Sequence, residues 1–322
     1  MLSLMSYNSQ SLPFSPKKST NSNTLVLNVQ QCRVNTKLSS PRQNTQDNVL
    51  EFVRKGYGSA SSYEQIRKDY PIEAVKVFLK NLRLLDNEKV IGVKSRPDQV
   101  KILELGSGTG KFTRAMLEVL KDKNIRVIAS DPLENMCEHF KRLLPETEII
   151  QCAAENIDLP DASVDVVIAS QSFHFFANPT ALEEINRVLV PNGLFGIIWK
   201  IPDYLSVPWM KDIWEFFAPL YKEKSIVFPF QEEWKSVFNP THRKLFSDIQ
   251  EDLSFKYAMP SSFDESYKYF SSVTAVASGS ESTKDSFRKL FNEVIGKKFK
   301  EKGTDLDHIP LKIFMYWCMK DN

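Results

Sequence analysis

The chain has 322 residues, with 42 lysines and arginines against 40 aspartates and glutamates, so its formal net charge is +2 at pH 7. This balance excludes the strongly basic surface of a nucleic-acid-binding protein. The sequence has no apolar run of about 18 residues that could cross a membrane. Its four cysteines lie far apart and form no Cys-x-x-Cys pair, which is typical of a reducing compartment and of a protein without a zinc site.

The beginning of the chain has an unusual composition. Residues 1–46 include five basic residues and no acidic one, and serine, asparagine, threonine and glutamine dominate. Such a segment buries too little apolar surface to offset the entropy of ordering, so residues 1–48 are predicted to be a disordered tail and residues 49–322 one folded domain. A basic, serine-rich, acid-poor segment is also typical of an organelle transit peptide. Because no amphipathic arginine-rich helix is visible, a plain tail on a cytoplasmic protein is favoured.

Residues 100–117 are the most informative stretch. A short apolar run ends at Leu105 and predicts a buried strand, and from Phe112 the apolar residues follow a helical spacing. Three glycines, Gly106, Gly108 and Gly110, alternate between the strand and the helix. Glycine leaves the backbone bare and reaches positive φ at low cost. A strand, a glycine turn and a helix N-terminus therefore predict a place where a ligand contacts the backbone, although packing alone could also explain a glycine-rich turn.

The glycine pattern separates two kinds of cofactor site. A dinucleotide fingerprint needs a glycine or alanine where Lys111 stands. The observed pattern, Glu-x-Gly-x-Gly-x-Gly from Glu104, resembles motif I of the class I S-adenosylmethionine (SAM) methyltransferases. The resemblance implies an α/β fold with a doubly wound, mostly parallel seven-stranded Rossmann-like sheet and an antiparallel last strand. It also implies that a loop passes beneath the methionine part of SAM and consists of Glu104, Gly106, Ser107, Gly108 and Gly110.

Upstream, the apolar spacing between residues 48 and 87 predicts helices. Tyr63, Arg67, Tyr70 and Pro71 resemble a Tyr-x-x-x-Arg-Pro-x-Tyr-Pro signature in the N-terminal cap of one branch of this family, although Lys68 replaces the first proline. The resemblance implies that the tyrosine and arginine, Tyr63 and Arg67, lie near the methionine end of SAM. The alternative is that the tyrosines only pack the cap onto the core.

Two further positions follow from the order of strands. Residues 126–130 predict a second strand that ends at Asp131, where the family has an acid that accepts hydrogen bonds from both ribose hydroxyls. Asp131 followed by Pro132 is also typical of a helix N-cap. Residues 147–152 predict a third strand, and the resemblance then places Ala154 and Glu155 at the adenine edge. Glu155 as a solvated loop acid is the alternative.

The fourth strand, residues 164–169, leads into Ser170, Gln171 and His174. This end resembles a Gln-x-x-His-Trp/Phe motif of the branch that includes trans-aconitate methyltransferase-like proteins and insect juvenile hormone acid methyltransferases. The resemblance implies that Gln171 and His174 are catalytic and face the reacting methyl group, with Ser170 beside the cofactor. The alternative is a core histidine among phenylalanines. The Asn/Asp-Pro-Pro-Tyr/Phe signature of amino-group methylation is absent here. An acidic cluster that could hold magnesium is also absent, so no metal is predicted.

The remainder completes the sheet. A helix capped by Asn178 and Pro179 precedes a fifth strand at residues 194–199. Residues 201–246 are rich in aromatic residues and predict a lid insertion over the strand ends, although aromatic residues at helical spacing often belong to the core. A sixth strand at 253–258, helices over 263–299 with a break at 278–282, and a last antiparallel strand at 311–318 follow.

The predicted function is methyl transfer from SAM to a small, apolar or acidic acceptor, with O-methylation of a carboxylate or hydroxyl favoured by the resemblance. A carboxylate needs no general base, whereas a hydroxyl does, and His174 is then the nearest candidate. The alternatives are a non-catalytic regulator or partner subunit that binds SAM or S-adenosylhomocysteine (SAH), and a nicotinamide-dependent enzyme. The sequence leaves the oligomeric state open.

Overall fold

The structure of the protein is a computed structural model that describes residues 51, 54–55, 60–85, 99–224, 226, 228–238, 245–303 and 306–321. All of them belong to one unit, Pro41–Asn322. The predicted tail at residues 1–48 lies outside the described residues.

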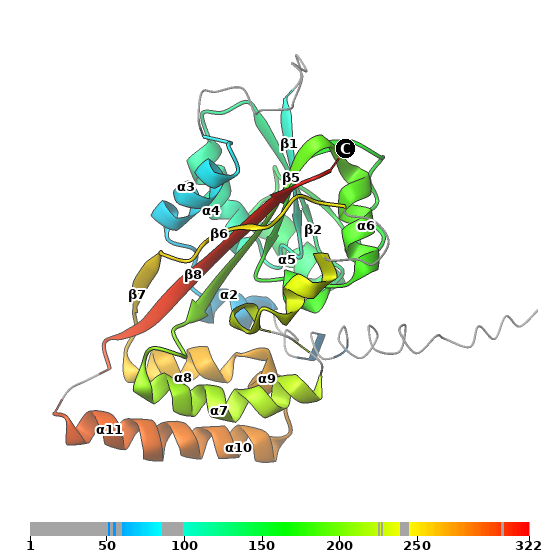
Figure 1. The fold of residues 1–322 in the computed structure, drawn as a ribbon. Helices are drawn as coiled ribbons and strands as arrows, with labels where there is room; N and C mark the ends of the chain where they lie inside the picture. Colours follow the sequence, from blue (N-terminus) through cyan, green and yellow to red (C-terminus); the bar gives the residue numbers. More distant parts are fainter. Residues whose placement is uncertain are drawn as a thin grey trace, which may run out of the picture. The chain divides into compact units, whose positions relative to one another are not determined.

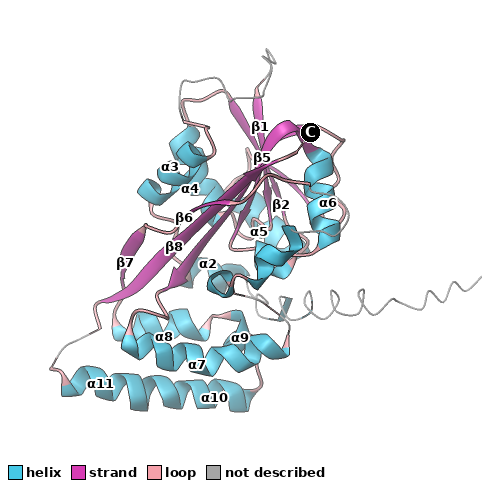
Figure 2. Cartoon of the chain, viewed as in Figure 1, coloured by secondary structure: helices cyan, strands magenta, loops and turns pink. Residues whose placement is uncertain are grey.

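A mostly parallel sheet forms the centre of this unit, with strands in the order β3-β2-β1-β4-β5-β8-β6 and β7 beside β8 (Figures 1 and 2). The strands are β1 Val100–Leu105, β2 Ile125–Ser130, β3 Glu148–Ile150, β4 Val164–Ser170, β5 Leu189–Pro202, β6 Gln250–Asp252, β7 Lys256–Pro260 and β8 His308–Met319. β1 pairs in parallel with β2 and β4, whereas β8 is antiparallel to β5. The predicted doubly wound α/β sheet with an antiparallel last strand is confirmed.

The predicted sixth strand differs from the observed one. Instead of one strand over residues 253–258, β6 and β7 are separated by three residues, and both pair with β8. β8 is long enough to carry both, since its 12 residues pair with β6 near one end and with β7 near the other. β5 also differs, because it continues beyond Trp199 to Pro202.

Helices cover both faces of the sheet (Figure 1). They are α2 Ala60–Ile66, α3 Ile72–Asn81, α4 Lys111–Leu120, α5 Glu134–Leu143, α6 Pro179–Val188, α7 Pro208–Glu223, α8 Phe263–Ser271, α9 Thr274–Ala277, α10 Glu281–Lys289 and α11 Gly296–Glu301. Short turns of other helix types are η1 Phe173–Phe175, η2 Pro229–Gln231, η3 Glu233–Phe238 and η4 Leu290–Ile295. The predicted break at residues 278–282 is confirmed, because α9 ends at Ala277 and α10 begins at Glu281.

Alternate residues of each central strand belong to two separate hydrophobic cores, one on each face of the sheet. Ile102 of β1 packs with Phe78 of α3 and Phe112 of α4 on one face. Leu103 and Leu105 belong to the core on the other face. Because successive strand side chains point to opposite faces, a strand covered on both sides must be apolar at nearly every position. This is why residues 100–105 and 164–169 are apolar at most positions.

Two helix starts test the predicted caps. Asn178 caps α6, since its side-chain oxygen accepts a hydrogen bond from the backbone N–H of Ala181 at 3.0 Å. The alternative prediction that Asp131 caps the next helix is wrong, because α5 begins at Glu134 with Leu133 at the N-cap. The Asp131 carboxylate is held instead by two backbone N–H groups, which are described below.

The aromatic insertion folds as α7, η2 and η3. In Figure 1, α7 lies with α8 and α9 beyond the arrowhead of β5, at the carboxyl end of that strand. Several of its aromatic residues are core residues, as Trp234 shows, because its ring lies 5.1 Å from that of Trp199 and 4.8 Å from that of Tyr316 between centroids. Others, including Tyr221 and Phe228, line a cavity.

Candidate functional site

A cavity of about 430 Å³ lies at the carboxyl ends of β1, β2, β4 and β5. The chain leaves β1 toward β2, while β4 lies on the other side of β1, so the cavity is at the point where the winding of the sheet reverses. In open α/β sheets this is the usual place for a ligand, and the volume is within the range of small-molecule sites.

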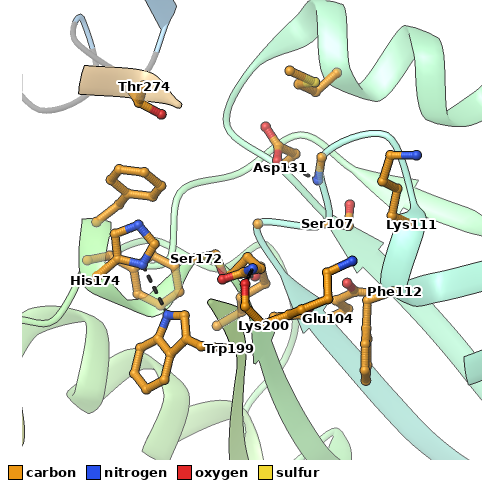
Figure 3. Close-up of a pocket in the computed structure, with 18 of the residues that line it drawn as sticks. Glu104, Ser107, Lys111, Phe112, Asp131, Ser172, His174, Trp199, Lys200 and Thr274 are labelled. Atoms are coloured by element: carbon orange, nitrogen blue, oxygen red, sulfur yellow. Dashed lines mark hydrogen bonds between the residues drawn. The ribbon is translucent and has the colours of Figure 1, made fainter. Parts of the chain in front are cut away.

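The cavity has two walls of different character; in Figure 3, His174 and Trp199 lie on the left, and Ser107, Lys111 and Phe112 lie on the right. We call the first the loop wall; it consists of residues 104–109, Lys111 and Phe112, together with Asp131, Ala154 and Glu155. We call the second the aromatic wall; it consists of Gln171, His174, Trp199, Lys200, Tyr204, Tyr221, Phe228 and Tyr269.

In the loop wall the backbone is bare. Gly106 has φ +69°, and a Cβ added there would lie 2.6 Å from the Cβ of Ser172. Gly108 has φ +55°, and nothing lies within 4 Å of the position that its Cβ would take. Between them, Ser107 Oγ is buried and has no hydrogen-bond partner in the described part of the chain. Open space beside a glycine and an unpartnered buried hydroxyl are expected where a polar ligand contacts the loop.

Gly110 differs from the other two glycines. It has φ +88° at the N-cap of α4, and its Cβ would lie 2.8 Å from Leu144 Cδ1 and 3.0 Å from the ring of Phe140. It is not among the residues that line the cavity. The structure therefore gives Gly110 a packing role between α4 and the end of α5, whereas Gly106, Ser107 and Gly108 face the cavity.

Two buried acids belong to the loop wall. Asp131 accepts hydrogen bonds from the backbone N–H groups of Gly108 and Leu133, both at 2.9 Å, and burial raises its pKa to about 6. Glu104 accepts a hydrogen bond from Thr113 Oγ1 at 2.6 Å. Burial, with a smaller contribution from the charge of Asp131, raises the pKa of Glu104 to about 8. Since all three donors are uncharged, the wall suits a ligand that brings positive charge and hydrogen-bond donors of its own.

At the aromatic wall, His174 is oriented by Trp199 (Figure 3). Trp199 Nε1 donates a hydrogen bond to His174 Nδ1 at 3.1 Å, and burial lowers the pKa of His174 to about 3. A neutral imidazole that accepts at Nδ1 carries its proton on Nε2. His174 therefore offers a hydrogen-bond donor to any ligand that Nε2 meets.

The neighbouring strand ends are also fixed. Gln171 has φ +56°, an unusual value for a residue other than glycine, and its side-chain amide donates to the backbone carbonyl of Lys200. Ser170 Oγ donates to the hydroxyl of Tyr70 at 3.1 Å. Glu155 accepts from the side-chain amide of Asn178 at 2.8 Å.

The N-terminal cap is fastened to the loop wall by charge. Glu64 of α2 pairs with Lys111 at 3.1 Å and with Arg114 at 2.6 Å, and it accepts a hydrogen bond from Thr109 Oγ1. Burial raises the pKa of Glu64, but the Thr109 hydroxyl and the two cations outweigh it, so the pKa is lowered. Arg67, three residues on, lies with its guanidinium 4.2 Å from the ring centroid of Tyr269. The side chain of Tyr63 lies outside the described residues.

Comparison with known proteins finds a methyltransferase family model and methyltransferase relatives. The family described as "Methyltransferase domain" matches residues 103–197. An uncharacterized methyltransferase of Mycobacterium tuberculosis is 30% identical over 195 residues, which cover 57% of this chain and 72% of that protein. The chain belongs to the class I SAM-dependent methyltransferases. An uncharacterized methyltransferase-like protein of Schizosaccharomyces pombe is 35% identical over 153 residues, but the match spans only 48% of this chain and about half, 54%, of that protein.

Solved structures of methyltransferases share the fold. Haemonchus contortus phosphoethanolamine N-methyltransferase 2, in complex with phosphomonomethylethanolamine and SAH, aligns with a TM-score of 0.51 at 14% identity. The alignment covers 86% of this chain and 60% of that protein. At this identity the likeness concerns the fold alone.

The structure brings most of the predicted methyltransferase site residues together. Those that line this cavity are Arg67, Glu104, Gly106, Ser107, Gly108, Asp131, Ala154, Glu155, Ser170, Gln171 and His174. In the part of the chain that is described, no group of three or more His, Cys, Asp or Glu side chains is arranged to hold a metal ion. Within the same residues, no helix has the length and apolar character needed to cross a bilayer.

Sequence reasoning missed several residues of the aromatic wall. Lys200 is the most notable, because it is a charged side chain within a strand that is otherwise almost entirely apolar from Leu194 onward. A lysine directly before the end of a central strand was a usable signal, but the strand was predicted to end at Trp199. Tyr204 and Tyr269 come from separate segments, and their convergence has no local sequence signal.

Proposed function

We propose that this methyltransferase binds SAM against the loop wall and methylates an oxygen of a small carboxylic acid held at the aromatic wall. The observation that carries the proposal is the pairing of a bare glycine loop with two buried acids, Glu104 and Asp131, at the reversal point of the sheet. The predicted resemblance to trans-aconitate and juvenile hormone acid methyltransferases supports an acid acceptor.

The residues present suit SAM. Each oxygen of the Asp131 carboxylate already accepts one backbone N–H and has a further lone pair for a ribose hydroxyl. Ser107 Oγ needs a partner, and the open side of Gly108 leaves room for one. Ala154 and Glu155 lie on the same wall for the adenine. Glu104 gains most from a cationic ligand, because its carboxylate is buried beside uncharged donors.

When bound, SAM supplies a methyl group on a sulfonium, and an acceptor oxygen that takes this methyl leaves the C–S electron pair on the sulfur of SAH. The donor is already reactive, so the protein contributes mainly alignment and exclusion of water, which can lower a barrier by roughly 7–11 kcal/mol. The fixed ring of His174 and the strained backbone of Gln171 provide such alignment.

The state of His174 favours an acid over a hydroxyl acceptor. A hydroxyl needs a base, but His174 Nδ1 is already an acceptor for Trp199, and Nε2 carries the proton. An ionised carboxylate needs no base and can accept the Nε2–H hydrogen bond. The aromatic residues of the second wall then surround an apolar body of the acid.

Calorimetry with SAM, SAH and NADH tests the first part of the proposal. We expect SAM and SAH to bind with one site per chain and NADH not to bind; binding of NADH alone would reverse the assignment. Transfer of labelled methyl from SAM to panels of acids, phenols and amines tests the second part. Tight SAH binding without transfer to any panel would favour a SAM-binding regulator.

A further inference from the structure

The aromatic wall contains a buried lysine that the proposed reaction does not yet use. Lys200 is 7% exposed and lies on β5 between Trp199 and Ile201, at the carboxyl end of the strand. Lysines are seldom buried to this degree unless a partner compensates the lost hydration. A partner that compensates the charge of Lys200 is therefore expected.

Within the protein the ammonium contacts uncharged groups. Lys200 Nζ donates hydrogen bonds to the backbone carbonyls of Lys68 at 2.6 Å and Asp69 at 2.9 Å, and it lies 5.0 Å from the ring centroid of Tyr70. The Asp69 carboxylate pairs with Lys111 and Arg114 instead. An ammonium has three N–H donors, so one remains after the two carbonyls are satisfied.

The charge of Lys200 is only partly compensated. Burial lowers its pKa to about 7, the nearby cations Arg67 and Lys111 add to the effect, and the Asp69 carboxylate opposes it with a smaller contribution. Lys200 lines the cavity, as do Arg67, Lys68 and Lys111, so an anion in the cavity can approach its ammonium. Such an anion would relieve the cost of burying this charge.

The surroundings of Lys200 define the anion. Gln171 donates to the Lys200 carbonyl, and His174, whose Nε2 carries the proton, lines the same cavity. Tyr204, Tyr221 and Phe228 line it as well. The cavity thus offers donors to a carboxylate and aromatic side chains to an apolar body.

We propose that Lys200 binds the carboxylate of the methyl acceptor, and that the acceptor is a monocarboxylic acid with an apolar body. This inference rests on the proposed function, since it concerns the acceptor of that reaction. A competing role for the same side chain is a general base toward a phenol or alcohol.

The test compares three variants of the full chain. Lys200→Met keeps the length of the side chain and removes the charge, and Lys200→Arg keeps the charge. Lys312→Met is the matched control, because Lys312 is also a strand lysine over an aromatic ring, 5.1 Å from the centroid of Phe314, but it does not line the cavity. Each protein is assayed with labelled SAM and with aliphatic and aryl acids paired with the alcohol and amide of the same carbon skeleton.

We expect Lys200→Met to raise KM for the preferred acid at least tenfold, with SAH affinity within about twofold of the wild type. Lys200→Arg should keep part of the acid binding, and Lys312→Met should behave as the wild type. Calorimetric binding of the acid to the SAH complex gives a readout independent of turnover, and it should be lost in Lys200→Met alone. The matched alcohols and amides should not bind.

An unchanged KM for acids in Lys200→Met would overturn the proposal. Methylation of phenols or alcohols only would instead support the general-base role of Lys200, provided that the wild-type rate rises with pH and the rate of Lys200→Met does not. Failure of the proposed function is separate, because it would appear as absence of SAH binding in the wild type. If the wild type does not bind SAH, or if Lys200→Met does not fold, Lys200 can still be tested by NMR on the wild-type protein. The pH titration of the Lys200 ε-carbon signal is recorded with and without a carboxylic acid. The proposal predicts that the acid raises the pKa of Lys200, and an unchanged pKa would contradict it.

Discussion

The two walls of the cavity are built in different ways. The loop wall takes its polar groups from one continuous stretch at the end of β1 and in the loop after it, from Asp131 directly after β2, and from the loop that follows β3. The aromatic wall takes Lys200 from β5, Tyr221 from α7 and Tyr269 from α8, with Tyr70 from the cap behind it. A wall of backbone and strand ends recognises a constant ligand, whereas a wall of side chains from inserted helices can change between relatives. Under the proposed function, the first wall recognises SAM and the second recognises the acceptor.

The largest effect on cofactor binding is expected from a substitution in the glycine loop. Gly106→Ala places a Cβ against Ser172 at positive φ, and overpacking and backbone strain each cost about 1–3 kcal/mol. We expect SAH affinity, measured by calorimetry, to fall roughly a hundredfold. Gly110→Ala is the control, because its Cβ meets Leu144 and Phe140 outside the cavity. It should lower the melting temperature with a smaller loss of SAH affinity, and an equal loss in both variants would contradict the distinction.

On the aromatic wall, His174→Ala separates turnover from cofactor binding. Loss of one charge-assisted hydrogen bond of about 1.5–3 kcal/mol should lower kcat roughly 10- to 100-fold, with little effect on SAH affinity. His139→Ala is the matched control, since His139 is a half-buried histidine on α5 that does not line the cavity. Full activity in His174→Ala would remove this histidine from the site.

Asp131→Ala tests the sugar-binding part of the loop wall. The carboxylate makes two backbone hydrogen bonds and is proposed to accept two more from SAM, so we expect SAM affinity to fall at least tenfold (about 1.4 kcal/mol). Asp285→Ala, which changes a surface acid paired with Arg288, should leave the affinity unchanged. An unchanged SAM affinity in Asp131→Ala would show that Asp131 only holds the loop.

A smaller effect concerns pH. The pKa values of Glu104 and Asp131 are raised from the model-compound values 4.5 and 3.8 to about 8 and about 6, respectively, so between these limits the folded protein binds more protons than the unfolded chain. Their contribution to stability is therefore present in acid and is lost as the pH rises toward 8. A cationic ligand favours the ionised Glu104, so the rise in melting temperature caused by SAM should be larger at pH 8.5 than at pH 6. Glu104→Gln should remove most of this difference, and a rise that shrinks with pH would contradict the assignment.

The sequence was most informative where structure is local. The strand that ends at Leu105, the glycine loop and the acid after β2 follow from apolar runs and their ends, because covering a strand on both faces leaves a continuous pattern. The same reasoning placed Gln171 and His174 at the end of β4. The sequence left a helix cap open as an alternative role for Asp131, because the Gly108 N–H that holds its carboxylate lies 23 residues earlier in the chain.

The aromatic wall was beyond such reasoning for a physical reason. The carbonyls of Lys68 and Asp69 that hold Lys200 come from a segment more than 130 residues earlier in the chain. Whether an aromatic residue of the lid enters the core, like Trp234, or the cavity, like Phe228, depends on how α7, η2 and η3 pack, which no spacing in the sequence specifies.

The most direct test of the account is the chemical form of the transferred methyl group. The protein is incubated with methyl-labelled SAM and a panel of acids, phenols and amines, and the products are then treated with mild alkali. We expect the label to be released as volatile methanol, because a methyl ester of an acid hydrolyses in alkali. Label that stays in an alkali-stable ether or methylamine, or no transfer by a protein that binds SAH, would contradict the account.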